Sequence, residues 1–329
     1  MRRVDFTNMD GELGEAIKSR LAAAQSILIT SHVRPDGDAI GSSLALALAL
    51  LDAGKQVQVV LADGLPASFD HLPGSENILT SAQGEFDLII SVDCSDLKRV
   101  GNALDGYRTP DIVIDHHATN GAFGKLNLIE PEAVATASVL TRHMREWGLS
   151  ITVPIADNLI CGIVTDTLGF RTANTTPESL RQAADLLELG ANMSNLYFLS
   201  LVRRTFPAAK YWGVGLSGLQ RSDGIIWTTL TVADRIASGY LGNDDADLIN
   251  IVSSIEDAFI AIIFVEQSDN STKISWRALN NAQMDVSKIA LQFGGGGHKA
   301  AAGAEISGTL DDVKERVLEA TRKALQLPI

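Results

Sequence analysis

The chain has 329 residues, of which 46% are hydrophobic and 20% are charged, and its formal net charge is −13. This composition can bury two medium-sized cores, and the charge argues against a protein that coats long nucleic acid, which needs a basic face to displace counterions. Cys94 and Cys161 lie far apart without C-x-x-C spacing, so no disulfide framework or Cys-type zinc site is expected. Residues 1–14 lack the apolar core of a secretory signal, and no apolar run is long enough to span a bilayer. We therefore expect a cytoplasmic protein without a membrane partner.

The N-terminal half alternates short apolar runs with helical patterns. Strands are predicted at Ile27–Thr30, Val57–Ala62, Phe86–Val92 and Ile112–Ile114, and a helix-forming run covers Gly41–Ala53. This rhythm predicts an α/β fold with a doubly wound, mostly parallel sheet. Ligands of such sheets gather where the strands end, so the side chains that follow each strand are candidates for function.

Helices are predicted along the middle of the chain. They cover Glu132–Trp147, Pro154–Thr167 and Pro177–Leu189, the last with Thr176 as its N-cap. Asn192–Leu219 also shows a helical pattern, which we interpret as a connection between two domains.

The pattern changes from Gly224 onward and predicts a second, smaller α/β domain. Its predicted strands are Ile225–Val232, Ala258–Glu266 and Lys273–Leu279, and its predicted helices are Val286–Phe293 and Leu310–Leu325. The predicted organisation is a first domain at 1–190, a helical connector at 191–222 and a second domain at 223–329.

Side chains suited to metal binding follow three of the predicted strands and one predicted helix. They are His32, Asp36 and Asp38 after the first strand, Asp93 after the third, His116 or His117 after the fourth, and Asp166 at the end of a helix. Imidazole mixed with carboxylate suits Mn²⁺, Fe²⁺, Co²⁺ or Zn²⁺ better than Mg²⁺ or Ca²⁺. Taken alone, the first segment has an equal alternative, in which Asp36 and Asp38 form an Asx turn and a helix N-cap.

The full set offers more ligands than one metal ion normally accepts from a protein, whereas two ions that share a bridging carboxylate would use them. Two ions about 3.5–4 Å apart activate water and neutralise the attacking and leaving oxygens of an in-line phosphoryl displacement. Asp93 could instead be a cap that ends a strand. Asp166 lies at a helix end where a carboxylate is unfavourable to the helix dipole, which supports a functional role. The set therefore predicts hydrolysis of phosphate esters.

A glycine run near the C-terminus is a second candidate site. It consists of Gly294, Gly295, Gly296 and Gly297, followed by His298. Backbone N–H groups without a Cβ beside them can surround an anion, and His298 and Arg277 could add donors. Glycine runs are more often only flexible turns, but the continuation into His-Lys and Ala300–Gly303 favours a close approach to a ligand. We expect the catalytic cleft to lie between the two domains.

Two further arginines are candidates for substrate contact. Arg34 lies inside the first segment, and Arg99 follows Asp93 in the chain. Each could hold a phosphate or form a surface salt bridge. Elsewhere, His143 has no neighbouring ligand type and is expected to be a surface or satisfied residue, and Cys94 a small buried side chain.

Together these segments resemble the motifs of the DHH phosphoesterase superfamily, which is named after Asp115-His116-His117. The matching segments read H-V-R-P-D-G-D-A-I-G-S, V-D-C-S-D, D-H-H-A-T-N and G-I-V-T-D-T, and F-G-G-G-G-H-K-A-A-A-G resembles the signature of the DHH-associated C-terminal domain. The resemblance covers essentially the whole chain. The compact two-domain layout is most similar to the nanoRNase and pAp phosphatase branch.

The resemblance implies an enzyme that uses two Mn²⁺ ions, with Mg²⁺ or Co²⁺ as substitutes. Its substrates would be short single-stranded RNA, hydrolysed to mononucleotides, and 3′-phosphoadenosine 5′-phosphate (pAp), hydrolysed to AMP. It implies that one ion is held by His32 and Asp36, that the other is held by Asp38, His116 and Asp166, and that the bridge is Asp93. His117 would face the scissile phosphate, and Asp115 would orient its neighbours.

The resemblance also leaves alternatives open. Arg277 matches a position where the family shows Arg followed by Ser, and Ala278 replaces that Ser, which removes one hydroxyl contact. A phosphodiesterase for cyclic or linear dinucleotides (c-di-AMP or pApA) is the close alternative, whereas Gly294–His298 argues against an inorganic pyrophosphatase. A non-catalytic nucleotide-binding protein would require a broken metal set. A homodimer is left open as the oligomeric state.

Overall fold

A computed structural model of the chain describes residues 11–256, 258–279 and 284–326. The chain divides into two compact units, Met1–Arg203 and Arg204–Ile329. The range 191–222, predicted as a connector, is shared between them. Each unit is described by itself below.

The first unit contains a six-stranded sheet. Its strands are β1 (Ser26–Thr30), β2 (Gln56–Val60), β3 (Ile78–Leu79), β4 (Leu88–Val92), β5 (Ile112–Asp115) and β6 (Leu126–Ile129). The order across the sheet is β3-β2-β1-β4-β5-β6, and every neighbouring pair is parallel. The order reverses between β1 and β4, as in other doubly wound sheets, so the predicted α/β fold is confirmed.

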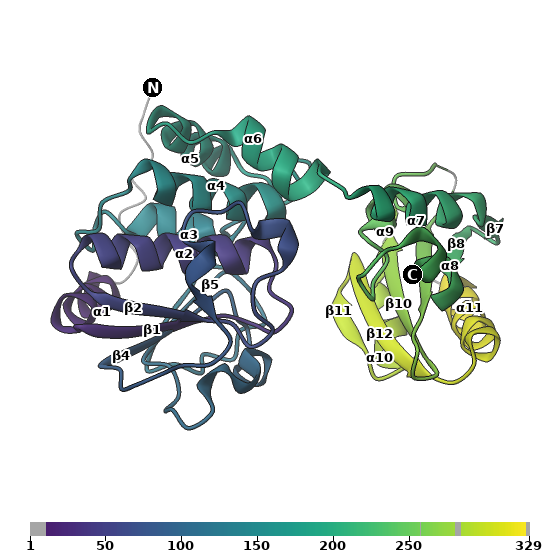
Figure 1. The fold of residues 1–329 in the computed structure, drawn as a ribbon, viewed down its shortest axis with the longest axis horizontal. Coiled ribbons are helices and arrows are strands. Elements are labelled where there is room, and N and C mark those ends of the chain that lie inside the picture. The colour runs from purple at the N-terminus through teal and green to yellow at the C-terminus, as the bar shows by residue number, and fades with distance from the viewer. Residues whose placement is uncertain (1–10, 257, 280–283, 327–329) are drawn as a thin grey trace. The chain divides into compact units, whose positions relative to one another are not determined.

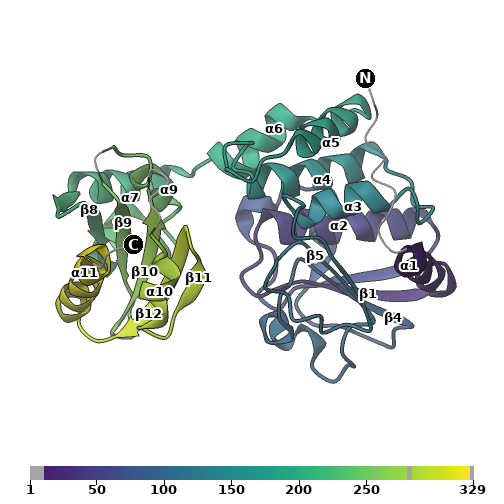
Figure 2. The ribbon, with the colours of Figure 1, turned by 180° about the vertical axis from the view of Figure 1, so that it is seen from behind.

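Helices cover one face of this sheet (Figures 1 and 2). The helices of the unit are α1 (Gly11–Ala23), α2 (Gly37–Asp52), α3 (Thr136–His143), α4 (Val153–Asp166), α5 (Pro177–Glu188) and α6 (Met193–Tyr197), with a π-helical turn η4 (Phe198–Val202) and the 3₁₀ turns η1 (Ala67–Phe69), η2 (Ser75–Asn77) and η3 (Leu97–Leu104). Ile27 and Ile29 of β1 are buried in the core that α2, α3 and α4 share. Leu28 points to the other face, where Val100 of η3 covers it. Both faces of the sheet are therefore buried, which explains the continuous apolar runs of its strands.

Two predicted helices differ from the structure. The helix predicted at Glu132–Trp147 is observed only as α3, which begins at Thr136. The N–H groups of its first two residues donate to the carboxylate of Asp38 and not to carbonyl oxygens of a preceding helical turn. The helix predicted at Asn192–Leu219 is interrupted at 203–205. The chain starts again as α7 (Phe206–Ser217), with Thr205 as N-cap and Pro207 in the first turn, since proline suits a helix start and disfavours a continuing helix before it. The N-cap predicted at Thr176 is confirmed as a capping box.

The second unit contains another six-stranded sheet with helices on both faces. Its strands are β7 (Gln220–Ser222), β8 (Ile225–Leu230), β9 (Ile260–Glu266), β10 (Ser271–Ala278), β11 (Gly296–His298) and β12 (Ala301–Ser307), and its helices after α7 are α8 (Val232–Ser238), α9 (Leu248–Val252), α10 (Val286–Leu291) and α11 (Leu310–Gln326). The order is β11-β12-β10-β9-β8-β7, with only the β8–β9 pair parallel. Alternate residues of β9 enter a core with α10 and α11 and a core with α7 and α9. Within the described ranges, every helix is too short or too polar to cross a membrane.

Candidate metal and catalytic site

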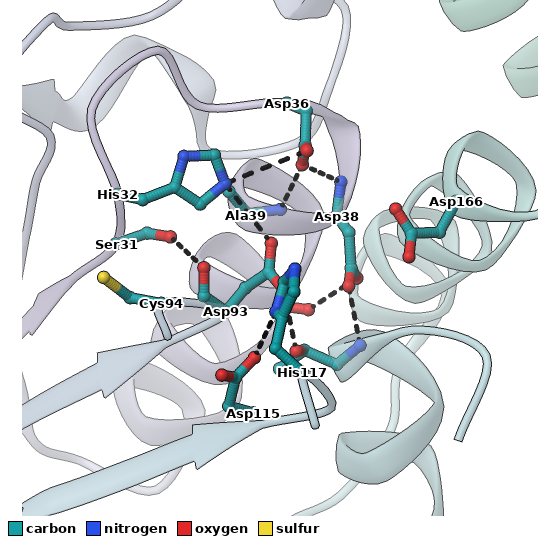
Figure 3. Close-up of polar contacts among 12 residues, drawn as sticks. Ser31, His32, Asp36, Asp38, Ala39, Asp93, Cys94, Asp115, His117 and Asp166 are labelled. Carbon is teal, nitrogen blue, oxygen red and sulfur yellow. Dashed lines mark hydrogen bonds and ion pairs between the residues drawn. The ribbon is translucent and has the colours of Figure 1, made fainter. Parts of the chain in front are cut away.

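The candidate site lies where the strand order of the first sheet reverses. His32 follows β1, Asp93 follows β4, and Asp115 ends β5, so three neighbouring strands deliver polar side chains to one edge of the sheet (Figure 3). Asp38 lies in the first turn of α2, and Asp166 is the last residue of α4. The fold therefore brings together six residues that the sequence predicted as metal ligands, although they span more than a hundred positions.

Three overlapping groups of ligand atoms lie within 4.8 Å of one another. They are His32, Asp36 and Asp93; Asp38, His116 and Asp166; and Asp93, His116 and His117. Asp93 belongs to the His32 group and also to a group with His116. Atoms that each lie about 2.0–2.2 Å from one ion are roughly 3–4 Å apart, so the spacing suits divalent ions.

The hydrogen bonds of two histidines leave Nε2 available as a ligand atom. Nδ1 of His32 lies 2.8 Å from the carbonyl oxygen of Val33, and Nδ1 of His116 lies 3.3 Å from that of Ala133. A carbonyl oxygen only accepts, so each Nδ1 carries a hydrogen, and Nε2 is the nitrogen of each ring that can bind a metal ion. A backbone carbonyl behind the ring is a common arrangement for histidines that bind metal.

The carboxylate of Asp93 lies between these two rings. Its Oδ2 is 3.6 Å from Nε2 of His32, and its Oδ1 is 3.7 Å from Nε2 of His116. Burial opposes ionisation of Asp93, but the surrounding imidazoles outweigh it and lower the pKa to about 2. Asp93 has left-handed backbone, with φ of 52°. A charged carboxylate held in uncommon backbone, with one oxygen toward each group, is suited to bridging two ions.

Asp36 is the N-cap of α2, and its second oxygen faces the candidate metal site. Its Oδ1 accepts hydrogen bonds from the N–H groups of Asp38 and Ala39, each at 3.1 Å, so it is the N-cap of α2. Its Oδ2 lies 3.8 Å from Nε2 of His32. The oxygen that caps the helix therefore differs from the oxygen that could bind a metal ion.

Asp38 is fully buried, and its oxygens accept several hydrogen bonds. Oδ1 accepts from Ala137 N at 2.9 Å and from Ser42 Oγ at 3.0 Å, and Oδ2 accepts from Thr136 N at 2.6 Å. Burial and the charges of Asp93 and Asp166 nevertheless raise the pKa of Asp38 well above its ordinary value. Crowded carboxylates with raised pKa values mark a place where a cation would be stabilising.

His116 lies beside two carboxylates, those of Asp38 and Asp166. Its Nε2 lies 4.0 Å from Oδ2 of Asp38 and 3.3 Å from Oδ2 of Asp166. Burial and repulsion from Asp93 also raise the pKa of Asp166 well above its ordinary value. The donor set of imidazole nitrogen and carboxylate oxygen fits a Mn²⁺-type ion.

His117 is held by Asp115. Its Nδ1 lies 2.8 Å from Oδ1 of Asp115, which also accepts from the N–H of His116. Burial would lower the pKa of His117, but Asp115 and Asp93 outweigh it and raise the pKa to about 9. The neighbouring carboxylates therefore favour the protonated form of this ring.

Two polar residues of the site were missed by sequence reasoning. Nδ2 of Asn120 donates to Oδ2 of Asp115 at 2.6 Å and to the carbonyl of Cys94 at 3.0 Å. Asn120 ends the D-H-H-A-T-N segment, which was a signal for it. Thr136 was hidden in the middle of a helix predicted to begin too early. Cys94 is buried, as predicted, and burial raises the pKa of its thiol to about 11.

The two candidate arginines lie on adjacent segments. The N–H of Val33 donates to the carbonyl of Arg99 at 2.6 Å, and the N–H of Arg34 donates to Oδ2 of Asp63 at 2.6 Å. Arg34 is exposed and has φ of 53°, and Arg99 is half-buried. Neither guanidinium lies within 4.0 Å of a carboxylate of the described residues.

The remaining candidates belong to the second unit. Arg277 lies on β10, and burial lowers the pKa of its guanidinium although Asp245 and Asp247 oppose the shift. Part of the glycine run is not a loop but strand β11, paired with β12. A Cβ on Gly295 would clash with Gly303, so this glycine permits the close approach of β12, and the close approach to a ligand stays a prediction. The side chain of His298 lies outside the described part of the chain.

Comparison with known proteins gives the family. The model of the DHH family, N-terminal domain, matches residues 26–163, and that of the DHHA1 domain matches residues 235–327. The bifunctional oligoribonuclease and PAP phosphatase NrnA of Thermus thermophilus is 35% identical over 306 residues, which cover 91% of this chain and 90% of that protein.

Two solved structures share the fold. An exopolyphosphatase-related protein from Bacteroides fragilis superposes with a TM-score of 0.86 at 26% identity, covering 96% of this chain and 98% of that one. Exonuclease RecJ bound to manganese gives a TM-score of 0.51 at 15% identity, covering 96% of this chain and 94% of that one. With both domains present in order and a relative alike over nearly the whole length, the chain belongs to the DHH family of phosphoesterases and is a hydrolase.

Proposed function

We propose that this chain is a Mn²⁺-dependent phosphoesterase that hydrolyses short oligoribonucleotides to mononucleotides and pAp to AMP. The observation that carries the proposal is the position of Asp93, whose two oxygens face His32 and His116 separately. The activity named for the Thermus thermophilus relative supports the choice of substrates.

The proposed ligands fall into two sets that share one carboxylate. His32 and Asp36 form one set, Asp38, His116 and Asp166 form the other, and Asp93 belongs to both. Two bound divalent ions would supply a more acidic water molecule and neutralise the charge of a phosphate. Mn²⁺ suits the mixed donors best, with Mg²⁺ or Co²⁺ as substitutes.

Asp115 and His117 act beside these ligands in the proposed site. Asp115 accepts the Nδ1 hydrogen of His117 and fixes the orientation of its ring. In the protonated form that Asp115 and Asp93 favour, His117 can bind a phosphate oxygen or donate a proton to a leaving oxygen.

The remaining candidates are assigned to the phosphates and the nucleotide. Arg34 and Arg99 lie on adjacent segments of the first unit, and Arg277 and the run Gly294–His298 are assigned to the second. We assign catalysis to 1–190, a connecting role to 191–222 and substrate binding to 223–329. The net charge of −13 supports a short ligand, since a long strand would need a basic face. A homodimer and a cytoplasmic location stay predictions.

The test is a substrate panel with Mn²⁺ present: RNA dinucleotide, pAp, pApA, cyclic di-AMP and pyrophosphate. Mononucleotides from the dinucleotide and AMP from pAp are expected. Asp38→Ala and Asp93→Ala should each lower kcat by at least about 100-fold, because a metal ion contributes several kcal/mol and each ~1.4 kcal/mol is tenfold.

Faster turnover of pApA or cyclic di-AMP than of RNA dinucleotide and pAp would favour the dinucleotide phosphodiesterase instead. No turnover of any member of the panel, together with nucleotide binding that survives removal of metal, would identify a non-catalytic nucleotide-binding protein.

A further inference from the structure

Thr136 contacts two of the proposed metal ligands at once. It is the first residue of α3 and is fully buried. Its backbone N–H donates to Oδ2 of Asp38 at 2.6 Å, and its hydroxyl donates to Oδ1 of Asp93 at 3.0 Å. One residue therefore joins a ligand of the second ion to the carboxylate proposed as the bridge.

We propose that Thr136 is a positioning residue of the two-metal site, whose hydroxyl sets the rotation of the Asp93 carboxylate. This inference rests on the proposed function. Oδ1 of Asp93 is the oxygen on the His116 side, while Oδ2 faces His32. The hydroxyl thus controls chiefly the ion held by Asp38, His116 and Asp166.

The reason lies in the freedom of an aspartate side chain. The terminal torsion of aspartate has broad wells, so hydrogen bonds must select one rotation of the carboxylate plane. The Thr136 hydroxyl occupies one lone pair of Oδ1 and leaves the other for an ion. Without that donor, Asp93 can turn Oδ1 away from His116, and the second ion loses a ligand in the correct direction.

The backbone of Thr136 is fixed independently of its hydroxyl. The N–H groups of Thr136 and Ala137 both donate to Asp38, and these bonds do not involve the side chain. Thr136→Val therefore keeps the backbone contacts and the branched shape and removes only the donor to Asp93. Thr136→Ser keeps that donor and removes a methyl group.

Ser31 offers a matched control. Its hydroxyl is also buried and also donates to Asp93, at 3.4 Å, but to the main-chain carbonyl oxygen and not to the carboxylate. Ser31→Ala therefore removes a hydroxyl next to the same residue without freeing the carboxylate.

The experiment titrates the full chain with Mn²⁺ by calorimetry and records electron paramagnetic resonance, which detects spin coupling between two ions joined by a carboxylate. In Thr136→Val one of the two Mn²⁺ affinities should fall by about 10–100-fold, the usual cost of losing a residue that orients a ligand. The coupled signal at two equivalents of Mn²⁺ should weaken in parallel. Thr136→Ser and Ser31→Ala should keep both the affinities and the coupled signal.

Melting in a chelator checks that each variant folds without metal, and Thr136→Ala serves as a second variant lacking the hydroxyl if Thr136→Val does not fold. Wild-type affinities and a wild-type coupled signal in the folded hydroxyl-free variant would overturn this inference alone. A wild-type chain that binds no Mn²⁺ would overturn the proposed function, and this inference with it.

Discussion

Glu130 is a buried carboxylate outside the candidate site, and it favours the protonated form of His143. Glu130 is 3% exposed, pairs with Arg142, and lies 2.6 Å from Nε2 of His143. Burial alone would lower the pKa of His143, but Glu130 and Glu146 outweigh it and raise the pKa. His143 is thus a satisfied residue, as the sequence predicted, and its proton contributes to folding.

The stabilisation of the folded state by the proton of His143 should decrease as pH rises. The pKa of His143 is raised in the folded state above its unfolded value of about 6.5, so the folded state binds the proton more tightly. The stabilisation is fully present below pH about 6.5 and is lost as pH rises through the folded pKa. Urea unfolding in a chelator should therefore show the stability of the wild type falling toward that of His143→Gln as pH is raised. A difference between the two that stays constant across this range would contradict the prediction.

The role of a single residue could be predicted where a sequence motif contains it. It could not be predicted where the residue reaches the site only through the fold. The ligand types at His32 and Asp93 could be read from the sequence because they follow apolar runs. Asp36 was left between two roles, since a sequence does not show which oxygen points where. Thr136 could not be found, because its partner Asp93 lies 43 positions away in the chain.

At the scale of elements, helices α2 and α4 approach each other through small residues. A Cβ on Gly162 would meet Oδ1 of Asp38 and the methyl of Ala137, and one on Gly41 would meet the backbone of Asn158. The close approach of α4 thus leaves no room for a Cβ beside Oδ1 of Asp38. Close packing of these helices and the shape of the candidate site are therefore linked.

Gly162→Ala should destabilise the chain and weaken Mn²⁺ binding. Overpacking costs about 1–3 kcal/mol, which exceeds the gain of up to about 1 kcal/mol from better helix propensity. The matched control is Gly14→Ala in α1, where a Cβ meets nothing within 4 Å. The control should be neutral or stabilising and keep the Mn²⁺ affinity. Denaturant unfolding and Mn²⁺ calorimetry measure both effects, and a stabilised Gly162→Ala would refute the argument.

Elements of strong periodicity were predictable, and short elements were not. The four strands read as apolar runs in the N-terminal half appear as β1, β2, β4 and β5, and their alternation with helical segments predicted the parallel sheet. Strand β11 was missed because glycines carry no hydrophobic pattern. The predicted start of α3 was wrong, because the helix begins where its N–H groups meet Asp38, which lies 98 positions earlier in the chain.

At the scale of the whole molecule, the buried cores separate with the two units. One large core and one smaller core belong to the first unit, and two others belong to the second. All proposed metal ligands lie within the first unit. Metal binding should therefore stabilise one part of the chain and leave the other unchanged.

Scanning calorimetry of the full chain should resolve this difference. At free Mn²⁺ about 100 times the dissociation constant, one unit gains about 2.7 kcal/mol per site, and its transition moves to higher temperature. The transition of the second unit should stay where it is, and Asp93→Ala should abolish the shift of the first. A single transition that moves as a whole would show that the units do not unfold independently.

The three imidazoles of the site differ in whether a substitution elsewhere can change the orientation of the ring. Main-chain carbonyls of residues 33 and 133 hold Nδ1 of His32 and His116, whereas a side chain, Asp115, holds that of His117. No side-chain replacement removes a carbonyl, so the ring orientation of the two proposed ligands is insulated from substitution at those positions. His117 has no such protection, because one codon change at Asp115 alters its partner. The orientation of the His117 ring is thus open to adjustment by a single substitution, whereas the orientation of the His32 and His116 rings is not.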